Sequence, residues 1–240
     1  SGDESLGQSL RRMSENPAGR AMMNQGIKAM SAMWFADLVD EFGLTREEED
    51  YFLRLVAGGM SSQQQAGMKM MTAESDAERE ALQAEVVEAQ EATRDAIKDF
   101  LNNDEDFATY EHYNEQLPER QQLEGLRNTM LEAGAPLTRE QEESVIEAMY
   151  KVRTTKAATT DWKGPGGMEA IVSGDATGKF EQEWQQNSRA TEAALGKILD
   201  KEQLDAFRRF QTQMKDMQLM SIKMAEKMFQ AKKDPAAGDE

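Results

Sequence analysis

Residues 214–228, Met-Lys-Asp-Met-Gln-Leu-Met-Ser-Ile-Lys-Met-Ala-Glu-Lys-Met, place five methionines three or four positions apart. Side chains at this spacing share one face of an α-helix. Elsewhere the sequence has no stretch that alternates apolar and polar residues long enough to indicate a strand, and no Asn-Gly hairpin signal. We therefore predict an all-α fold with a long final helix that begins at about Lys201.

Three short segments share the pattern of a helix start. Each has an apolar residue, then an N-cap oxygen, and an acidic or amide side chain three positions after the cap that can reach back to it. With the other helix signals they predict seven to eight helices, several of them long, in an elongated helical bundle or hairpin array. The segments are Leu44-Thr45-Arg46-Glu47-Glu48, Leu137-Thr138-Arg139-Glu140-Gln141 and Leu199-Asp200-Lys201-Glu202-Gln203.

Glycine and proline indicate where these helices end or bend. Gly43 is typical of a C-terminal stop, and Pro118 is expected to kink or split its helix. The pair Gly58-Gly59 is expected to bend its helix or to allow close packing against a neighbour. We predict a single helical domain over residues 1–233, with a Gly-rich loop at 161–178 and a disordered tail at 234–240.

The chain is strongly acidic, with a formal net charge of -17. A field of that sign repels nucleic acid, so we predict no DNA or RNA partner. The charge is uneven, because 15 acidic and 4 basic side chains lie between residues 73 and 120, but 8 basic and 4 acidic between 201 and 233. These are either solvated faces, or the basic last helix meets the acidic middle within one chain or across a dimer.

Few residues suggest chemistry. Without cysteine, and with His112 as the one histidine, disulfides, thiolate metal sites and multi-histidine zinc sites are excluded. Residues 174–180 resemble a phosphate-binding loop, but only three residues separate the glycines, and Phe180 stands where Ser or Thr would reach the metal ion. We predict no enzymatic activity, no cofactor and no metal. No apolar run is long enough for an integral membrane segment.

Methionine is unusually frequent, with 17 residues against 9 phenylalanines. The stripe on the last helix is a core filled with adaptable thioethers, a face that binds different apolar partners with help from flanking lysines, or a set of Cu(I) ligands. The candidate partner-binding residues lie on the first and last helices and are Met23, Met30, Met214, Met217, Met220, Met224 and Met228.

Leu137 to Gln141 also resembles the LTxxQ signature of the Spy/CpxP-like bacterial envelope proteins, and the other two helix starts match it in part. The block from Phe107 to Arg153 is similar to a stretch of uncharacterised, exported helical proteins of bacteria. The resemblance implies a periplasmic location and a curved helical dimer. It also implies ATP-independent binding of unfolded clients, or stress and metal sensing.

We therefore expect a non-enzymatic bacterial envelope protein that binds apolar segments of other proteins, or a second copy of itself. Its location is expected to be periplasmic or exported, after removal of a signal peptide, and a cytoplasmic location stays open. One alternative is a structural or regulatory dimeric scaffold with buried methionine stripes. The other is a ligand-binding protein whose pocket uses the Gly-rich loop with Trp162 and Trp184.

Overall fold

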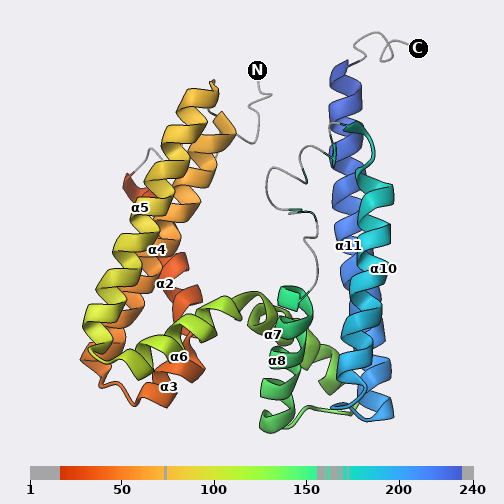
Figure 1. Cartoon of the computed structure of the whole chain (residues 1–240), viewed down its shortest axis with the longest axis horizontal. Helices are drawn as coiled ribbons and strands as arrows, with labels where there is room; N and C mark the ends of the chain where they lie inside the picture. The colour runs from red at the N-terminus through yellow and green to blue at the C-terminus, as the bar shows by residue number, and fades with distance from the viewer. Residues whose placement is uncertain are drawn as a thin grey trace. The chain divides into compact units, whose positions relative to one another are not determined.

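The computed structural model describes residues 17–72, 75–155, 160, 162, 167, 170–171 and 173–233. Within these ranges the chain forms nine α-helices with defined bounds and no strand, which confirms the all-α prediction. The helices group into two compact units, Ser1–Glu115 and Gln116–Glu240 (Figure 1). These units divide the residues for which the sequence predicts one helical domain.

The first unit is built around a long helical hairpin. Its helices are α2 (Pro17–Trp34), α3 (Ala36–Phe42), α4 (Arg46–Thr72), α5 (Asp76–Leu101) and α6 (Asp104–Glu115). Helices α4 and α5 lie antiparallel and side by side, and α2 packs on α4 (Figure 1).

The helix starts of the first unit follow the predicted capping patterns. The Glu48 carboxylate accepts hydrogen bonds from the Thr45 backbone N–H (2.9 Å) and hydroxyl (2.7 Å), and Ser75 Oγ accepts the Glu78 N–H (3.2 Å). From the sequence, Asp104 is also expected to cap the helix that contains Phe107 and Tyr110, but this expectation is wrong. Asn103 is the cap, because its Oδ1 accepts the backbone N–H of the residue three positions later (2.7 Å).

The second unit consists of two antiparallel helix pairs. Helices α7 (Leu117–Glu132) and α8 (Arg139–Thr155) form one pair, and α10 (Ala176–Leu195) and α11 (Lys201–Lys233) form the other. Helix α8 packs on α10, and α7 packs on α11. Pro118 lies in the first turn of α7, just after α6 ends, so the predicted split at this proline is confirmed.

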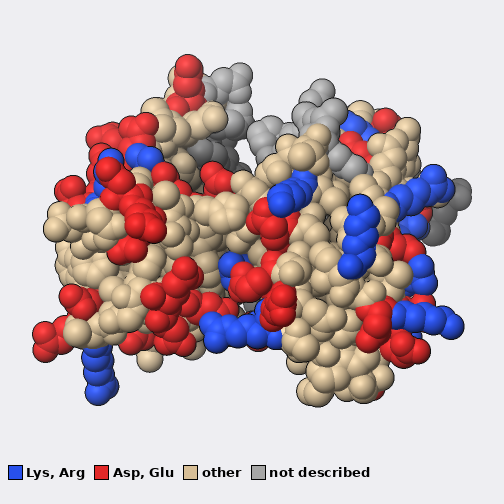
Figure 2. Space-filling model, turned by 60° about the horizontal axis from the view of Figure 1, so that its bottom comes forward, with Lys and Arg blue, Asp and Glu red and all other residues tan. Residues whose placement is uncertain are grey.

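The acidic character of the chain is visible on its surface. On the face drawn in Figure 2, acidic side chains gather over the helices of the first unit, and basic side chains extend from the helices of the second. Two basic residues of α11 have acidic partners on α10. Arg208 pairs with Glu192, and Lys215 lies 3.8 Å from Glu181.

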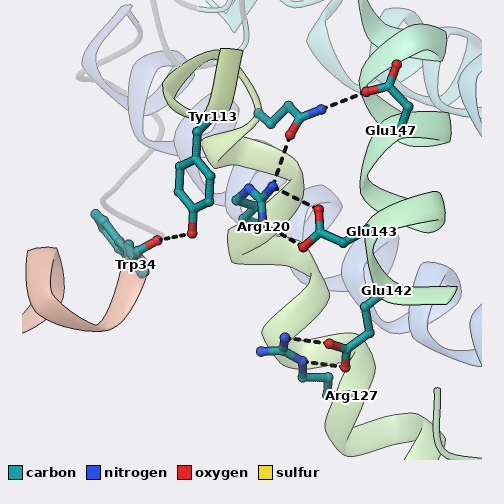
Figure 3. Close-up of polar contacts among 8 residues, drawn as sticks. Trp34, Tyr113, Arg120, Arg127, Glu142, Glu143 and Glu147 are labelled. Atoms are coloured by element: carbon teal, nitrogen blue, oxygen red, sulfur yellow. Dashed lines mark hydrogen bonds and ion pairs between the residues drawn. The ribbon is translucent and has the colours of Figure 1, made fainter. Parts of the chain in front are cut away.

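An aromatic cluster forms the core of the first unit. Phe35 and Phe52 are fully buried with ring centroids 5.9 Å apart, and Tyr110 stacks against Phe35 at 6.3 Å. Burial raises the pKa of Tyr110 to about 12. The Tyr113 hydroxyl donates to the backbone oxygen of Trp34 (2.8 Å; Figure 3), which ties α6 to the end of α2.

Two features hold the helices of the second unit together. Buried Leu, Met, Val, Ile and Phe side chains from all four helices form one continuous apolar core. At its edge, arginines of α7 pair with glutamates of α8, as Figure 3 shows. Arg127 makes two 2.7 Å bonds to Glu142, and Arg120 bonds both oxygens of Glu143 at 3.2 and 3.0 Å.

The segments that join the helices within each pair are related and contact each other. Residues 134–141 and 196–203 both begin with Gly and end with the Glu-Gln of a helix start. The side-chain amide of Gln141 donates to Oε1 of Gln203 (2.9 Å), and the amide of Gln203 donates to Oε1 of Gln141 (3.1 Å). Each oxygen also accepts the backbone N–H of its own N-cap residue.

The second N–H of each amide reaches across to the opposite segment. Gln203 donates to the Pro136 carbonyl (3.2 Å) and Gln141 donates to the Ile198 carbonyl (3.3 Å), which are equivalent positions in the two segments. Both amides are therefore fully hydrogen-bonded, although Gln203 is only 4% exposed. These reciprocal hydrogen bonds join the two helix pairs at one end of the unit.

Candidate binding cavity and methionine surface

A cavity of about 270 Å³ lies among the four helices of the second unit. Its apolar lining comes from α8, α10 and α11, and its polar lining is mostly amide and hydroxyl groups such as Gln122, Asn187 and Thr191. Apolar walls with a few polar groups are typical of sites that bind rather than react. The apolar side chains are Met149, Val152, Trp184, Phe207, Phe210 and Met214.

One ion pair lies on the wall of this cavity. Glu119, on the first turn of α7, is only 2% exposed, and its carboxylate receives Nε (2.6 Å) and Nη2 (3.1 Å) of Arg153 from the last turn of α8. A buried carboxylate needs such a partner because desolvation of an isolated charge is costly. The pair places one half-exposed cation beside the apolar side chains of the cavity.

Trp184 is held in the cavity wall by a smaller aromatic group. The centroid of its ring lies 5.6 Å from that of Phe180, and Trp162 meets Phe180 edge-on with the centroids 5.4 Å apart. The indole N–H of Trp162 donates to Glu183 (2.8 Å). Trp162 and Trp184 therefore contact the same phenylalanine, but of the two only Trp184 lines the cavity.

Glu183 fastens two described residues of the preceding segment to α10. Besides the Trp162 indole it accepts the hydroxyl (2.6 Å) and the backbone N–H (3.2 Å) of Thr160. Burial alone would raise the pKa of Glu183, but these hydrogen bonds outweigh it and lower that pKa below its ordinary value. These hydrogen bonds thus favour the ionised form of the Glu183 side chain.

The Gly-rich segment is described only in part. Residues 163–166, which include two of its five glycines, lie outside the described residues. At its other end, α10 begins at Ala176, so residues 176–178 are helical where the sequence predicts a loop. Lys179, in the segment that resembles a phosphate-binding loop, also lies within this helix.

The predicted partner-binding methionines do not share one environment. On α11, Met214 is half-buried against the core and lines the cavity, whereas Met217, Met220 and Met224 are 56%, 69% and 56% exposed. Met30 is exposed on α2, in the other unit. The side chains of Met23 and Met228 lie outside the described residues.

The exposure of these methionines differs along α11 because the neighbouring helices cover different faces of its two halves. In the first half of the helix, Phe207 and Phe210 are buried against α7 and α8. In the second half, the buried contact moves round to Leu219 and Ile222, which pack against Phe180 and Trp184 of α10. The methionine stripe therefore passes from a covered face to an open one, and we call Met217, Met220 and Met224 the methionine surface.

Sequence reasoning missed several residues of the cavity. Glu119 and Arg153 look like ordinary charged helix residues, and their pairing joins positions 34 apart in the chain. Phe210 and Met149 were recognisable only as apolar helix positions. No local pattern indicates that a gap remains between helices, because that depends on the sizes of side chains from four separate segments.

A shallower depression of about 420 Å³ lies beside the cavity, on the outer surface of α10 and α11. Its lining is mostly polar and charged, including Glu181, Arg189 and Lys215. It shares Trp184 and Ser188 with the cavity. With so few apolar side chains, we regard it as the rim of the cavity rather than a second site.

Among the described residues, no three His, Cys, Asp or Glu side chains are placed to hold a metal ion. His112 is exposed on α6, in the other unit from the cavity. Within the same described ranges, every helix is too short or too polar to cross a membrane. No protein-family model, curated protein or solved structure matches the chain.

Proposed function

We propose that this chain is a non-enzymatic protein that binds an apolar segment of another protein in the cavity of its second unit. The observation that carries the proposal is the cavity lining. Met149, Phe210 and Met214 offer adaptable apolar surface next to Trp184. A ring of amide and hydroxyl side chains around them can hydrogen-bond the backbone or polar residues of a bound segment.

The size of the cavity favours a side chain over a free small molecule. Pockets for drug-sized ligands have volumes of roughly 300–1,000 Å³, and this cavity is smaller, at about 270 Å³. It suits one or two large apolar side chains that protrude from a helix or an extended segment, which is the usual way a groove anchors a peptide. The proposed place of action is the periplasm, supported by the LTxxQ resemblance and by the similarity of residues 107–153 to exported bacterial proteins.

The test is a pair of matched substitutions. Thr191 lines the cavity and Thr212 is exposed on α11, and each hydroxyl donates to the carbonyl four residues earlier, at 2.9 and 3.0 Å. Thr191→Phe should fill the cavity, whereas Thr212→Phe adds the same ring to open surface. Binding of a fluorescein-labelled, leucine-rich amphipathic peptide is measured by anisotropy, with circular dichroism to verify that both variants fold.

We expect the wild-type chain and Thr212→Phe to bind the peptide with similar affinity, and Thr191→Phe to bind at least about tenfold more weakly, because the anchoring space is gone. The same variants should rank in the same order in suppressing aggregation of an unfolded client. Equal binding by Thr191→Phe, or no binding by the wild-type chain, would refute the proposal. Binding of a small apolar dye without the peptide would favour the ligand-binding alternative.

A further inference from the structure

The methionine surface has a two-fold pattern. Around Met220, the sequence carries Asp216 and Met217 one turn before, and Lys223 and Met224 one turn after. All five residues are exposed on α11. Because a helix advances about 100° per residue, the three methionines form one stripe and the two charged residues lie together along one edge of it.

This pattern is complementary to itself when two copies of the helix run antiparallel. A two-fold axis near Met220 places Met220 against its own equivalent and Met217 against Met224 of the second copy. The same axis places Asp216 beside Lys223 of the second copy, twice per interface. In an isologous contact each such pair occurs in both directions, so one short sequence satisfies both sides.

The parallel arrangement is disfavoured by charge. It would set the charged edge of each copy against the Met217 and Met224 edge of the other, so Asp216 and Lys223 would lose the opposite charge that the antiparallel arrangement offers them. Within the part of the chain that the structure describes, neither residue takes part in an ion pair, whereas Lys215 on the same helix has a partner in Glu181. Both charges are therefore available to a second copy.

We propose that the methionine surface binds the same surface of a second copy, with the two α11 helices antiparallel about Met220. The interface uses a different face of α11 from the cavity, so it stands apart from the proposed function. A contact of about two and a half helical turns buries less than the roughly 1,200 Å² of a standard interface, and a weak, reversible dimer is expected. Such a dimer is also expected to weaken as salt screens its edge charges.

A charge exchange tests the orientation. Asp216→Lys and Lys223→Asp should each weaken dimerisation about tenfold or more, because each single change sets two like-charged pairs across the interface. The double variant Asp216→Lys/Lys223→Asp restores opposite charges and should dimerise like the wild-type chain. Sedimentation equilibrium of the full chain, at low salt and protein concentrations on the order of 100 μM, measures the effect.

A covalent trap tests the contact itself. The chain has no cysteine, so Met220→Cys introduces one thiol per copy, close to its equivalent across the two-fold axis. The control is Leu131→Cys, at a residue of α7 that is 68% exposed. Under mild oxidation, Met220→Cys should form a covalent dimer at least about tenfold faster. Equal rates for the two variants, or failure of the double charge exchange to restore the dimer, would overturn the proposal, and so would a monomeric wild-type chain at all concentrations.

Discussion

At the scale of single residues, the amide pair of Gln141 and Gln203 connects two distant helix pairs, which the local sequence around each residue does not indicate. The helix-start pattern correctly predicts that each glutamine reaches back to its own N-cap residue. It does not predict that the two side chains bond each other, because they are 62 positions apart. The capping pattern is local, and the pairing depends on how the two helix pairs meet.

Replacing Gln203 by Ala should destabilise the second unit by about 1–3 kcal/mol. The change removes the hydrogen-bond partner of the half-buried Gln141 amide and of the Asp200 backbone N–H, and part of their desolvation is no longer offset. Urea unfolding measures the loss. Gln121→Ala, at an exposed position of α7, is the control and should change stability by less than about 0.5 kcal/mol. Equal effects of the two substitutions would contradict the described pairing.

Glu183 should make the stability of the second unit depend on pH. Its pKa is lowered in the folded chain by the hydrogen bonds from Thr160 and Trp162. A carboxyl of this kind stabilises the fold above its unfolded pKa, and the contribution is lost as the pH falls through the lower folded value. The wild-type chain should thus be more stable than Glu183→Gln at pH 7, and the difference should shrink below about pH 4.

The measurement is urea unfolding of both chains at several pH values from 7 to about 3. Glu181→Gln, an exposed position two residues earlier on the same helix, is the control. A stability difference between the wild-type chain and Glu183→Gln that stays constant down to the lowest pH would show that the carboxylate is not held as described. Tryptophan emission recorded in the same samples follows the release of Trp162.

At the scale of helices, most starts and ends follow from the sequence. Gly43 ends α3 with a positive φ of 59°, and the starts of α4, α8 and α11 fall directly after their predicted N-cap residues. Caps and stops are readable because each depends on hydrogen bonds within one turn. The burial of each helix face by neighbouring helices cannot be predicted from such local patterns, and the methionine stripe shows why. Its period is constant, but its cover by neighbouring helices ends after Met214.

The glycine pair of α4 illustrates the same limit. Helix α4 runs from Arg46 to Thr72, and the two glycines have different surroundings. A Cβ on Gly59 would lie 2.9 Å from the Thr93 methyl group of α5, whereas one on Gly58 would meet nothing within 4 Å. The sequence leaves bending and close packing open, and the contact to Thr93 assigns close packing to Gly59.

This difference gives a matched pair of substitutions. Gly58→Ala should stabilise the first unit by about 0.5–1 kcal/mol, because alanine has the higher helix propensity and nothing opposes its methyl group. Gly59→Ala should destabilise it by about 1 kcal/mol, because the hairpin must shift to relieve the contact. Chemical denaturation of the two variants measures both effects. A gain of stability in both would mean that α4 and α5 are not packed this closely.

At the scale of the whole molecule, the sequence predicts the fold class, and it names Met214 and Trp184 as candidate site residues. It does not predict that they line one cavity, since the lining comes from all four helices of the second unit. The proposed function depends on that convergence. Trp184 therefore provides a natural reporter, and the other two tryptophans provide references in the same molecule.

The most direct test is an NMR titration of the three indole N–H groups in the ¹⁵N-labelled, full-length chain with the unlabelled amphipathic peptide. The proposal predicts that the Trp184 resonance shifts in a saturable way, because its ring lines the cavity. Trp34, in the other unit, should stay unchanged. Saturable binding that leaves Trp184 unchanged, or a shift at Trp34 alone, would contradict the assignment of the binding site to this cavity.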